Sequence, residues 1–162
     1  MTTVLANLPD VVPPHAPGVV LQLYAAGVDV GVDSVGLIAQ SAYETGWWRY
    51  TGKVSLGFCN TAGMKVRDTA VVKSILGTQD DNHPLCHQIF QNWRMGCLAH
   101  AWHARRYAGE TRAPSPNPDP RWDLVDMSRP APTWADLSGR WAVPGVGYGE
   151  RIEELMAQLA QE

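Results

Sequence analysis

The stretch that most constrains the fold runs from Asp33 to Gly46 and predicts a helix with well-defined ends. Asp33 is a favourable N-cap residue, and Gly46 can adopt the left-handed conformation that ends a helix. Between them apolar residues recur at helical spacing, so one face of this helix should be buried. Two tryptophans, Trp47 and Trp48, follow the glycine directly. We therefore expect this helix to lie inside a helical domain, with its C-terminal end close to aromatic side chains.

Glu44 is the only carboxylate of this helix after its N-cap, and it lies in the last turn. The negative end of the helix dipole disfavours its charged form, and burial by a neighbouring tryptophan would add a desolvation cost. Both effects raise the pKa of a carboxyl group. A carboxylic acid that stays protonated near neutral pH is what an acid catalyst for a glycosidic oxygen needs. The competing interpretation is a solvated surface glutamate, the usual state of such a residue.

The rest of the chain predicts further helices and one small sheet. Amphipathic or well-capped patterns predict helices over residues 17–27, 93–107 and 149–161, and a short one that opens at the capping sequence Thr133-Trp134-Ala135-Asp136. A polar, glycine-punctuated segment and a run of β-branched residues predict a small β lobe over about 51–76. We thus expect an α+β fold that is mainly helical.

The length of 162 residues suits one domain, assigned to residues 15–162, preceded by an N-terminal arm over residues 1–14. Residues 113–120 alternate proline with small polar residues and predict an extended surface linker.

Composition excludes several classes of partner. The net charge of −3 argues against nucleic acid as the main partner, because phosphate binding requires clustered lysine and arginine.

The three cysteines do not show the spacing of a disulfide framework and are interpreted as free thiols. No signal peptide and no membrane-spanning stretch is visible, so we expect synthesis in the cytoplasm without membrane insertion. No cofactor is expected.

Four sequence blocks, in order, resemble the peptidoglycan N-acetylglucosaminidases of glycoside hydrolase family seventy-three, in particular their phage-type branch. The first block is Gln-Ser-Ala-Tyr-Glu-Thr-Gly-Trp at 40–47, and the second is Asn-Thr-Ala-Gly-Met-Lys at 60–65. The third is His-Gln-Ile-Phe-Gln-Asn-Trp-Arg-Met-Gly at 87–96, followed by His100 and His103, and the fourth spans 139–149. The resemblance implies a lysozyme-like domain, mainly helical with a small β lobe, that forms one catalytic unit over 15–162.

The resemblance also implies a reaction and its residues. The bond cleaved would be the β-1,4 bond between N-acetylglucosamine and N-acetylmuramic acid, with Glu44 protonating the leaving oxygen. A second carboxylate would activate water, or the 2-acetamido group of the substrate would assist. The candidates for that carboxylate are Asp81, then Asp80, then Asp68. For each of them the alternative is an aspartate that caps its own loop.

Several further residues are candidates for binding the glycan. Trp47, Trp48 and Tyr50 could stack on sugar rings. Asn60 and Lys65 could position acetamido groups or hold the turn, and for Asn60 the turn role is favoured. The fourth block supplies Trp141, at a position where many relatives have a cleft-lining tyrosine, and Tyr148.

The histidines are a competing signal. His83, His87, His100 and His103, with two cysteines nearby, could build a zinc site, but none of the usual ligand spacings is present. We therefore expect no metal, and expect His100 and His103 to border or brace the cleft.

The expected partner is the peptidoglycan glycan strand. A murein hydrolase without a signal peptide would reach the wall through a holin-type lesion or inside a virion, with another phage protein supplying targeting or release. Two alternatives remain open. One is a lytic transglycosylase that uses Glu44 alone, and the other is a non-catalytic wall-binding or virion structural module.

Overall fold

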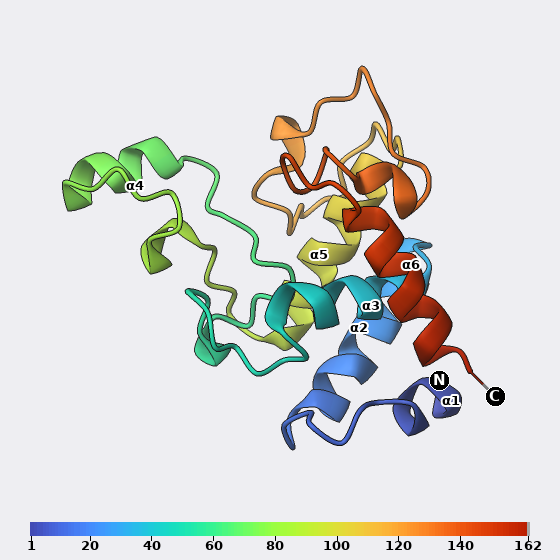
Figure 1. Cartoon of the computed structure of the whole chain (residues 1–162). Helices are drawn as coiled ribbons and strands as arrows, with labels where there is room; N and C mark the ends of the chain where they lie inside the picture. The colour runs from blue at the N-terminus through green and yellow to red at the C-terminus, as the bar shows by residue number, and fades with distance from the viewer. Residues whose placement is uncertain (162) are drawn as a thin grey trace.

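A computed structural model describes residues 1–161, and its centre is a body of four helices (Figure 1). These helices are α2 (Ala16–Val30), α3 (Ser34–Thr45), α5 (Trp93–Tyr107) and α6 (Tyr148–Leu159). Helix α2 packs against α3 and α5, and α6 covers another side of α3. Leu37 and Ile38 of α3, with Ile152 of α6, are fully buried. The helix that ends at Glu44 is therefore the central element of the molecule.

The ends of α3 are those that the sequence predicts. Asp33 accepts hydrogen bonds from the backbone N–H groups of Val35 and Gly36, and Gly46 ends the helix with a φ of 59°. The helix predicted over 93–107 is also confirmed as α5, and its N-cap is Asn92. These two helices could be predicted because their capping residues act locally.

The N-terminal segment packs on the body. Helix α1 (Thr2–Ala6) places Val4 in the same apolar core as α2 and α3. The Asn7 amide donates a hydrogen bond to the backbone oxygen of Leu159 at 3.1 Å, so the two ends of the chain lie side by side (Figure 1).

The predicted α+β fold with a small β lobe is wrong, because the described residues 1–161 contain no sheet. Within the described part of the chain, two isolated bridges, Lys65 with His87 and Ser138 with Ala142, are the only extended pairings. The segment predicted as a strand is helix α4 (Thr69–Leu76), which Asp68 caps by accepting from the Val71 N–H. The β-branched residues of this segment favour a strand. The N-cap residue before them and the glycine after them stabilise a helix instead.

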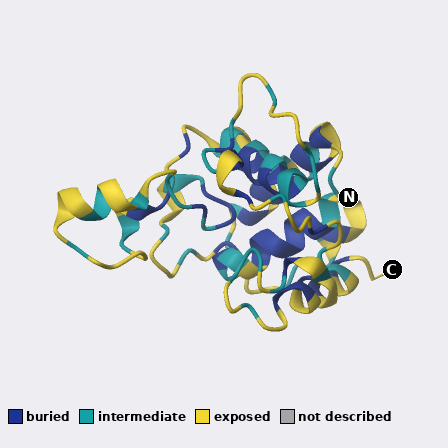
Figure 2. Cartoon of the chain, turned by 90° about the horizontal axis from the view of Figure 1, so that it is seen from above, coloured by how far each residue is buried: buried dark blue, intermediate teal, exposed yellow. Residues whose placement is uncertain are grey.

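Residues 65–87 form an outer lobe that extends away from the body and carries α4 at its tip (Figure 1). Its base is closed by backbone hydrogen bonds on either side of the Lys65–His87 bridge. Most of the α4 surface is exposed, and Ile75 is 78% exposed (Figure 2). The lobe therefore depends on its base rather than on an apolar core.

Short 3-10 turns and loops complete the chain. The turns are η1 (Leu56–Phe58), η2 (Pro84–Cys86), η3 (Trp122–Leu124) and η4 (Ala135–Leu137). The predicted cap before η4 is present, because Asp136 accepts hydrogen bonds from Thr133 and its own N–H donates back to the Thr133 hydroxyl. Among residues 1–161, no helix combines the length and apolar character that crossing a membrane requires.

Gly96 provides a test of how the second block is held against α5. A Cβ added at Gly96 would lie 1.8 Å from the backbone oxygen of Cys59, so the loop could not keep its place. We expect Gly96→Ala to cost about 1–3 kcal/mol and to lower Tm by roughly 3–10 °C in thermal denaturation. Gly18→Ala is the matched control, because a Cβ there meets nothing within 4 Å and alanine favours the helix, so stability should hold or rise by up to about 1 kcal/mol. Equal Tm values for the two variants would contradict this packing.

Candidate functional site

Glu44 lies where two cavities meet, on the side of the body that faces the outer lobe. One cavity has a volume of about 410 Å³ and the other about 490 Å³. Glu44, Gly63, Lys65 and Asn82 line both of them. Because the two cavities share this wall, they form one groove with the Glu44 carboxyl near its middle.

The carboxyl group of Glu44 is mostly buried, and this burial raises its pKa above the ordinary value of 4.5. Hydrogen bonding from Tyr148 and then from Trp141 favours the charged form and partly opposes the effect of burial. The Tyr148 hydroxyl donates to Oε1 at 2.5 Å. On the other oxygen, a Cβ added at Gly63 would lie 3.6 Å from Oε2, so the backbone of the second block approaches the acid closely.

A chain of buried hydrogen bonds runs into Glu44 from α5. Burial lowers the pKa of His100 to about 3, so its ring is neutral and one nitrogen donates while the other accepts. His100 Nε2 lies 2.8 Å from Gln40 Oε1, which can only accept, so Nε2 carries the hydrogen. His100 Nδ1 then accepts from the Thr61 hydroxyl at 3.1 Å. The Gln40 amide donates to the Tyr148 oxygen at 2.9 Å, and Tyr148 donates to Glu44.

Every donor in this chain points toward the carboxyl group. The first three members, Thr61, His100 and Gln40, are at most 1% exposed. These three side chains are shielded from water, so the orientation of each is fixed by its hydrogen-bond partner in the chain. The chain thus holds the Tyr148 hydroxyl, and through it the Glu44 carboxyl, in one position.

None of the predicted second carboxylates reaches the groove. Asp81 pairs with Lys73 at 2.7 Å, and this lysine lowers the pKa of the Asp81 carboxyl. Asp80 accepts from the backbone N–H of Asn82, and Asp68 caps α4. Asp80 and Asp68 therefore have the capping role that was the alternative to catalysis, and the Asp81 carboxylate is engaged in an ion pair. Among residues 1–161, Glu44 is the sole carboxylate that lines either cavity.

Trp48 is not a stacking platform, because it is fully buried in the body. Its indole N–H donates to the Ser41 hydroxyl at 3.0 Å, and its backbone N–H donates to the Thr45 hydroxyl at 2.9 Å. Trp47 and Trp48 both have positive φ, 59° and 58°, so the chain turns left-handed after Gly46 and sends the second ring inward. Trp47 packs edge-on against Trp48 and lines neither cavity.

The other predicted glycan-binding residues divide into three positions. Tyr50 and Trp141 each line one of the cavities, and Lys65 lines both. Tyr148 lines neither cavity and donates a hydrogen bond to Glu44. Asn60 also borders the first cavity, but it is fully buried and all its side-chain hydrogen bonds go to backbone groups of 62, 64 and 88. Asn60 therefore ties the turn to the base of the outer lobe, which was its favoured role.

A pair that the sequence does not predict, His103 with Asp119, places one member at the second cavity. His103 Nδ1 is 2.8 Å from Asp119 Oδ2, and both residues are buried. His103 lines the cavity beside Trp141. Asp119 escaped notice because it lies within the proline-rich segment interpreted as a surface linker, and no local pattern distinguishes a buried aspartate there.

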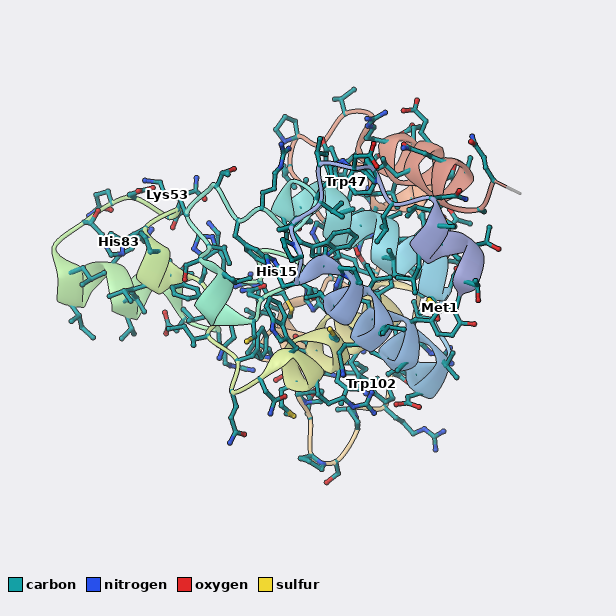
Figure 3. All side chains as sticks on the ribbon, turned by 90° about the horizontal axis from the view of Figure 1, so that it is seen from below. Met1, His15, Trp47, Lys53, His83 and Trp102 are labelled. Atoms are coloured by element: carbon teal, nitrogen blue, oxygen red, sulfur yellow. The ribbon has the colours of Figure 1, made fainter. Side chains whose placement is uncertain are left out.

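The histidines do not converge on a metal site. His83 lies on the outer lobe, apart from the helical body (Figure 3). His100 and His103, on α5, point instead to Gln40 and Asp119. Within the described chain, no group of three or more histidine, cysteine or acidic side chains is arranged to hold a metal ion.

The chain matches no protein-family model, no curated protein and no solved structure. Its function must therefore be argued from its own site. That site consists of one buried carboxylic acid in a groove, held from behind by a hydrogen-bond chain, with a His–Asp pair at one end.

Tyr148→Phe tests the hydrogen bond to Glu44. Since the Tyr148 hydroxyl favours the charged carboxylate, its loss should raise the pKa of Glu44 further. The pKa can be followed by carbon NMR of the Glu44 carboxyl group. Tyr43→Phe is the control, because the ring of Tyr43 contacts that of Tyr148 edge-on and its hydroxyl makes no bond to Glu44. A Glu44 pKa that falls in Tyr148→Phe would contradict this geometry.

Glu44→Gln tests the cost of burying the carboxyl. Because the folded-state pKa is raised, stability is lost as pH rises from the unfolded value near 4.5 through the folded pKa. At neutral pH we expect Glu44→Gln to be more stable than the parent, by about 1.4 kcal/mol for each unit of elevation. The gain should vanish in denaturant unfolding at pH below 4.5.

Glu150→Gln is the control for this measurement. Hydrogen bonds from its own backbone N–H and from Ser138 lower the pKa of the Glu150 carboxyl. Its charged form therefore favours folding, so the neutral variant should gain no stability at neutral pH. A Glu44→Gln protein that is less stable than the parent at neutral pH would show that burial does not penalise the charge.

Proposed function

We propose that this protein is a peptidoglycan hydrolase, an endo-β-N-acetylglucosaminidase that cleaves the β-1,4 bond between N-acetylglucosamine and N-acetylmuramic acid. Glu44 acts as the general acid and protonates the leaving oxygen. The observation that carries this proposal is the position of Glu44 at the junction of two cavities, where it is the one carboxylate of the described residues that lines either of them. A polymer that fills both cavities would present a linkage, rather than a chain end, to the acid.

The state of Glu44 supports the proposed role. An acid catalyst must carry a proton at the pH of the reaction, and burial moves the pKa of Glu44 in that direction. The hydrogen-bond chain behind it fixes the carboxyl in one orientation, which is the preorganisation that proton transfer requires.

The lining of the groove supports a charged glycan. Three cationic residues, Lys53, Lys65 and Arg121, line the cavities against the single carboxylate of Glu44. Peptidoglycan carries carboxylates on its peptide stems, whereas a neutral glycan offers no partner for such cations. Trp141 and Tyr107 add aromatic surface at the second cavity, and sugar rings stack on such surfaces.

A second candidate is a lytic transglycosylase, which needs one acid and no activated water. It is favoured by the absence of another carboxylate from the cavity walls within residues 1–161. The two activities differ in product, because a transglycosylase leaves a 1,6-anhydro sugar and a hydrolase leaves a reducing end.

The sequence blocks resemble phage-type enzymes, so we propose a bacteriophage lysin that acts on the bacterial cell wall. Release through a holin or carriage in a virion would bring it there, with another phage protein as the partner for targeting. Peptidoglycan is the substrate in either case, and the reaction requires no cofactor.

Glu44→Gln should abolish digestion of purified cell walls, with a loss on the order of 10²–10⁴-fold. Reducing ends and the masses of released fragments are the measurements. Asp81→Asn is the matched control, because this carboxylate pairs with Lys73 outside the groove, and it should digest walls like the parent.

Three outcomes would count against the proposal. Digestion that survives in Glu44→Gln would remove the acid from the mechanism. Products with 1,6-anhydro ends would replace the hydrolase by the transglycosylase. A parent protein that binds walls without cutting them would be a non-catalytic wall-binding or virion structural module.

A further inference from the structure

His103 lies at the cavity wall, and its partner Asp119 is buried beside it. Both residues are buried as wholes, with side-chain exposures of 8% for His103 and 0% for Asp119. His103 nevertheless lines the second cavity together with Glu44, Trp141 and Arg121. His103 therefore shares a single cavity with the proposed acid.

Asp119 fixes which nitrogen of His103 carries the hydrogen. Its Oδ2 accepts from His103 Nδ1 at 2.8 Å, and its Oδ1 accepts from the backbone N–H of Arg121 at 2.8 Å. A carboxylate only accepts, so in the neutral form of the ring the hydrogen lies on Nδ1 and Nε2 keeps a free lone pair.

Nε2 of His103 faces the cavity. It has no hydrogen-bond partner within residues 1–161, and no fully buried side-chain nitrogen or oxygen there lacks one. An Nε2 without a protein partner must therefore reach the open space that the side chain lines.

Aromatic rings hold the imidazole in this direction. Tyr107 meets it edge-on at 5.2 Å, and Trp141 meets it at 5.0 Å and 70°. Trp141 lines this cavity together with Glu44, so the indole ring that packs against His103 lies in the same cavity wall as the acid. His103 thus has a fixed orientation in the cavity that it shares with the acid.

We propose that His103 is the general base of the hydrolysis and that Asp119 is its positioning residue. This inference rests on the proposed hydrolase function. It supplies the water-activating base that Asp80 and Asp81 do not. Imidazole is the commonest general base in enzymes, and a carboxylate on its other nitrogen stabilises the charged ring that forms.

The reaction balances with these two groups. The Glu44 carboxyl gives its proton to the glycosidic oxygen as the bond from that oxygen to the sugar C1 breaks. A water oxygen forms the new bond to C1, and His103 Nε2 takes the proton of that water. Two hydroxyl ends are released, Glu44 is left charged, and solvent returns the proton from His103 to Glu44. Because the water attacks the face opposite the leaving group, the product is inverted.

The tautomer can be tested without activity. Long-range nitrogen–proton NMR on the protein should show His103 with a hydrogen on Nδ1 and none on Nε2 at a pH where the ring is neutral. His100 is the internal control, because its hydrogen lies on Nε2. A hydrogen on Nε2 of His103 in the neutral ring would overturn the proposal, since that nitrogen could not accept a proton.

Kinetics of His103→Gln and Asp119→Asn on purified walls test the roles. We expect kcat to fall on the order of 10²-fold or more in His103→Gln with little change in KM, and to fall less in Asp119→Asn. Asp119→Asn keeps an acceptor for Nδ1 and removes the charge, so folding should persist by circular dichroism. His83→Gln, on the outer lobe, is the control and should match the parent.

Product stereochemistry distinguishes this inference from the proposed function. Inverted sugars from the parent and formation of an α-glycosyl azide by His103→Ala in azide would support His103 as the base. Retained configuration, or His103→Gln with parental kcat, would overturn it while Glu44-dependent cleavage kept the hydrolase intact. Walls that stay uncut by the parent would instead contradict the hydrolase itself.

Discussion

The hydrogen bond from Tyr148 to Glu44 is the interaction on which the rest of the site depends. It joins the first turn of α6 to the last turn of α3, and so links residues 104 positions apart in the chain. Gln40 and His100 extend it through the buried interior to α5. Three of the four helices of the body thus contribute to the placement of one carboxyl group.

Burial and hydrogen bonding act on Glu44 in opposite directions. Burial raises its pKa and so favours the protonated form. The hydrogen bond from Tyr148 stabilises the charged form, which would remain after proton transfer. In the proposed reaction, Glu44 would therefore be a proton donor whose charged form already has a hydrogen-bond partner. In the second cavity, the His103 side chain is likewise held by a buried hydrogen-bond partner, Asp119, and the two residues form a second pair. The two pairs would need little rearrangement during a reaction.

The sequence could predict what depends on local rules. The caps of α3, the bounds of α5 and the position of Glu44 follow from residues within one or two helical turns. The direction of Trp48 could not be predicted, because a left-handed turn after Gly46 decides it. Helix α4 was missed although its caps, Asp68 and Gly77, are also local, because the β-branched residues between them favour a strand. The His103–Asp119 pair depends on tertiary folding of a proline-rich loop that has no local signature.

A crystal structure of the Glu44→Gln variant with a bound fragment of the peptidoglycan glycan would test the central claim most directly. The account predicts sugar rings in both cavities, with a glycosidic oxygen within hydrogen-bond distance of the residue 44 side chain. It also predicts a water between His103 Nε2 and the sugar C1, on the face opposite that oxygen. A glycan bound elsewhere on the molecule, with the groove beside residue 44 empty, would contradict the account.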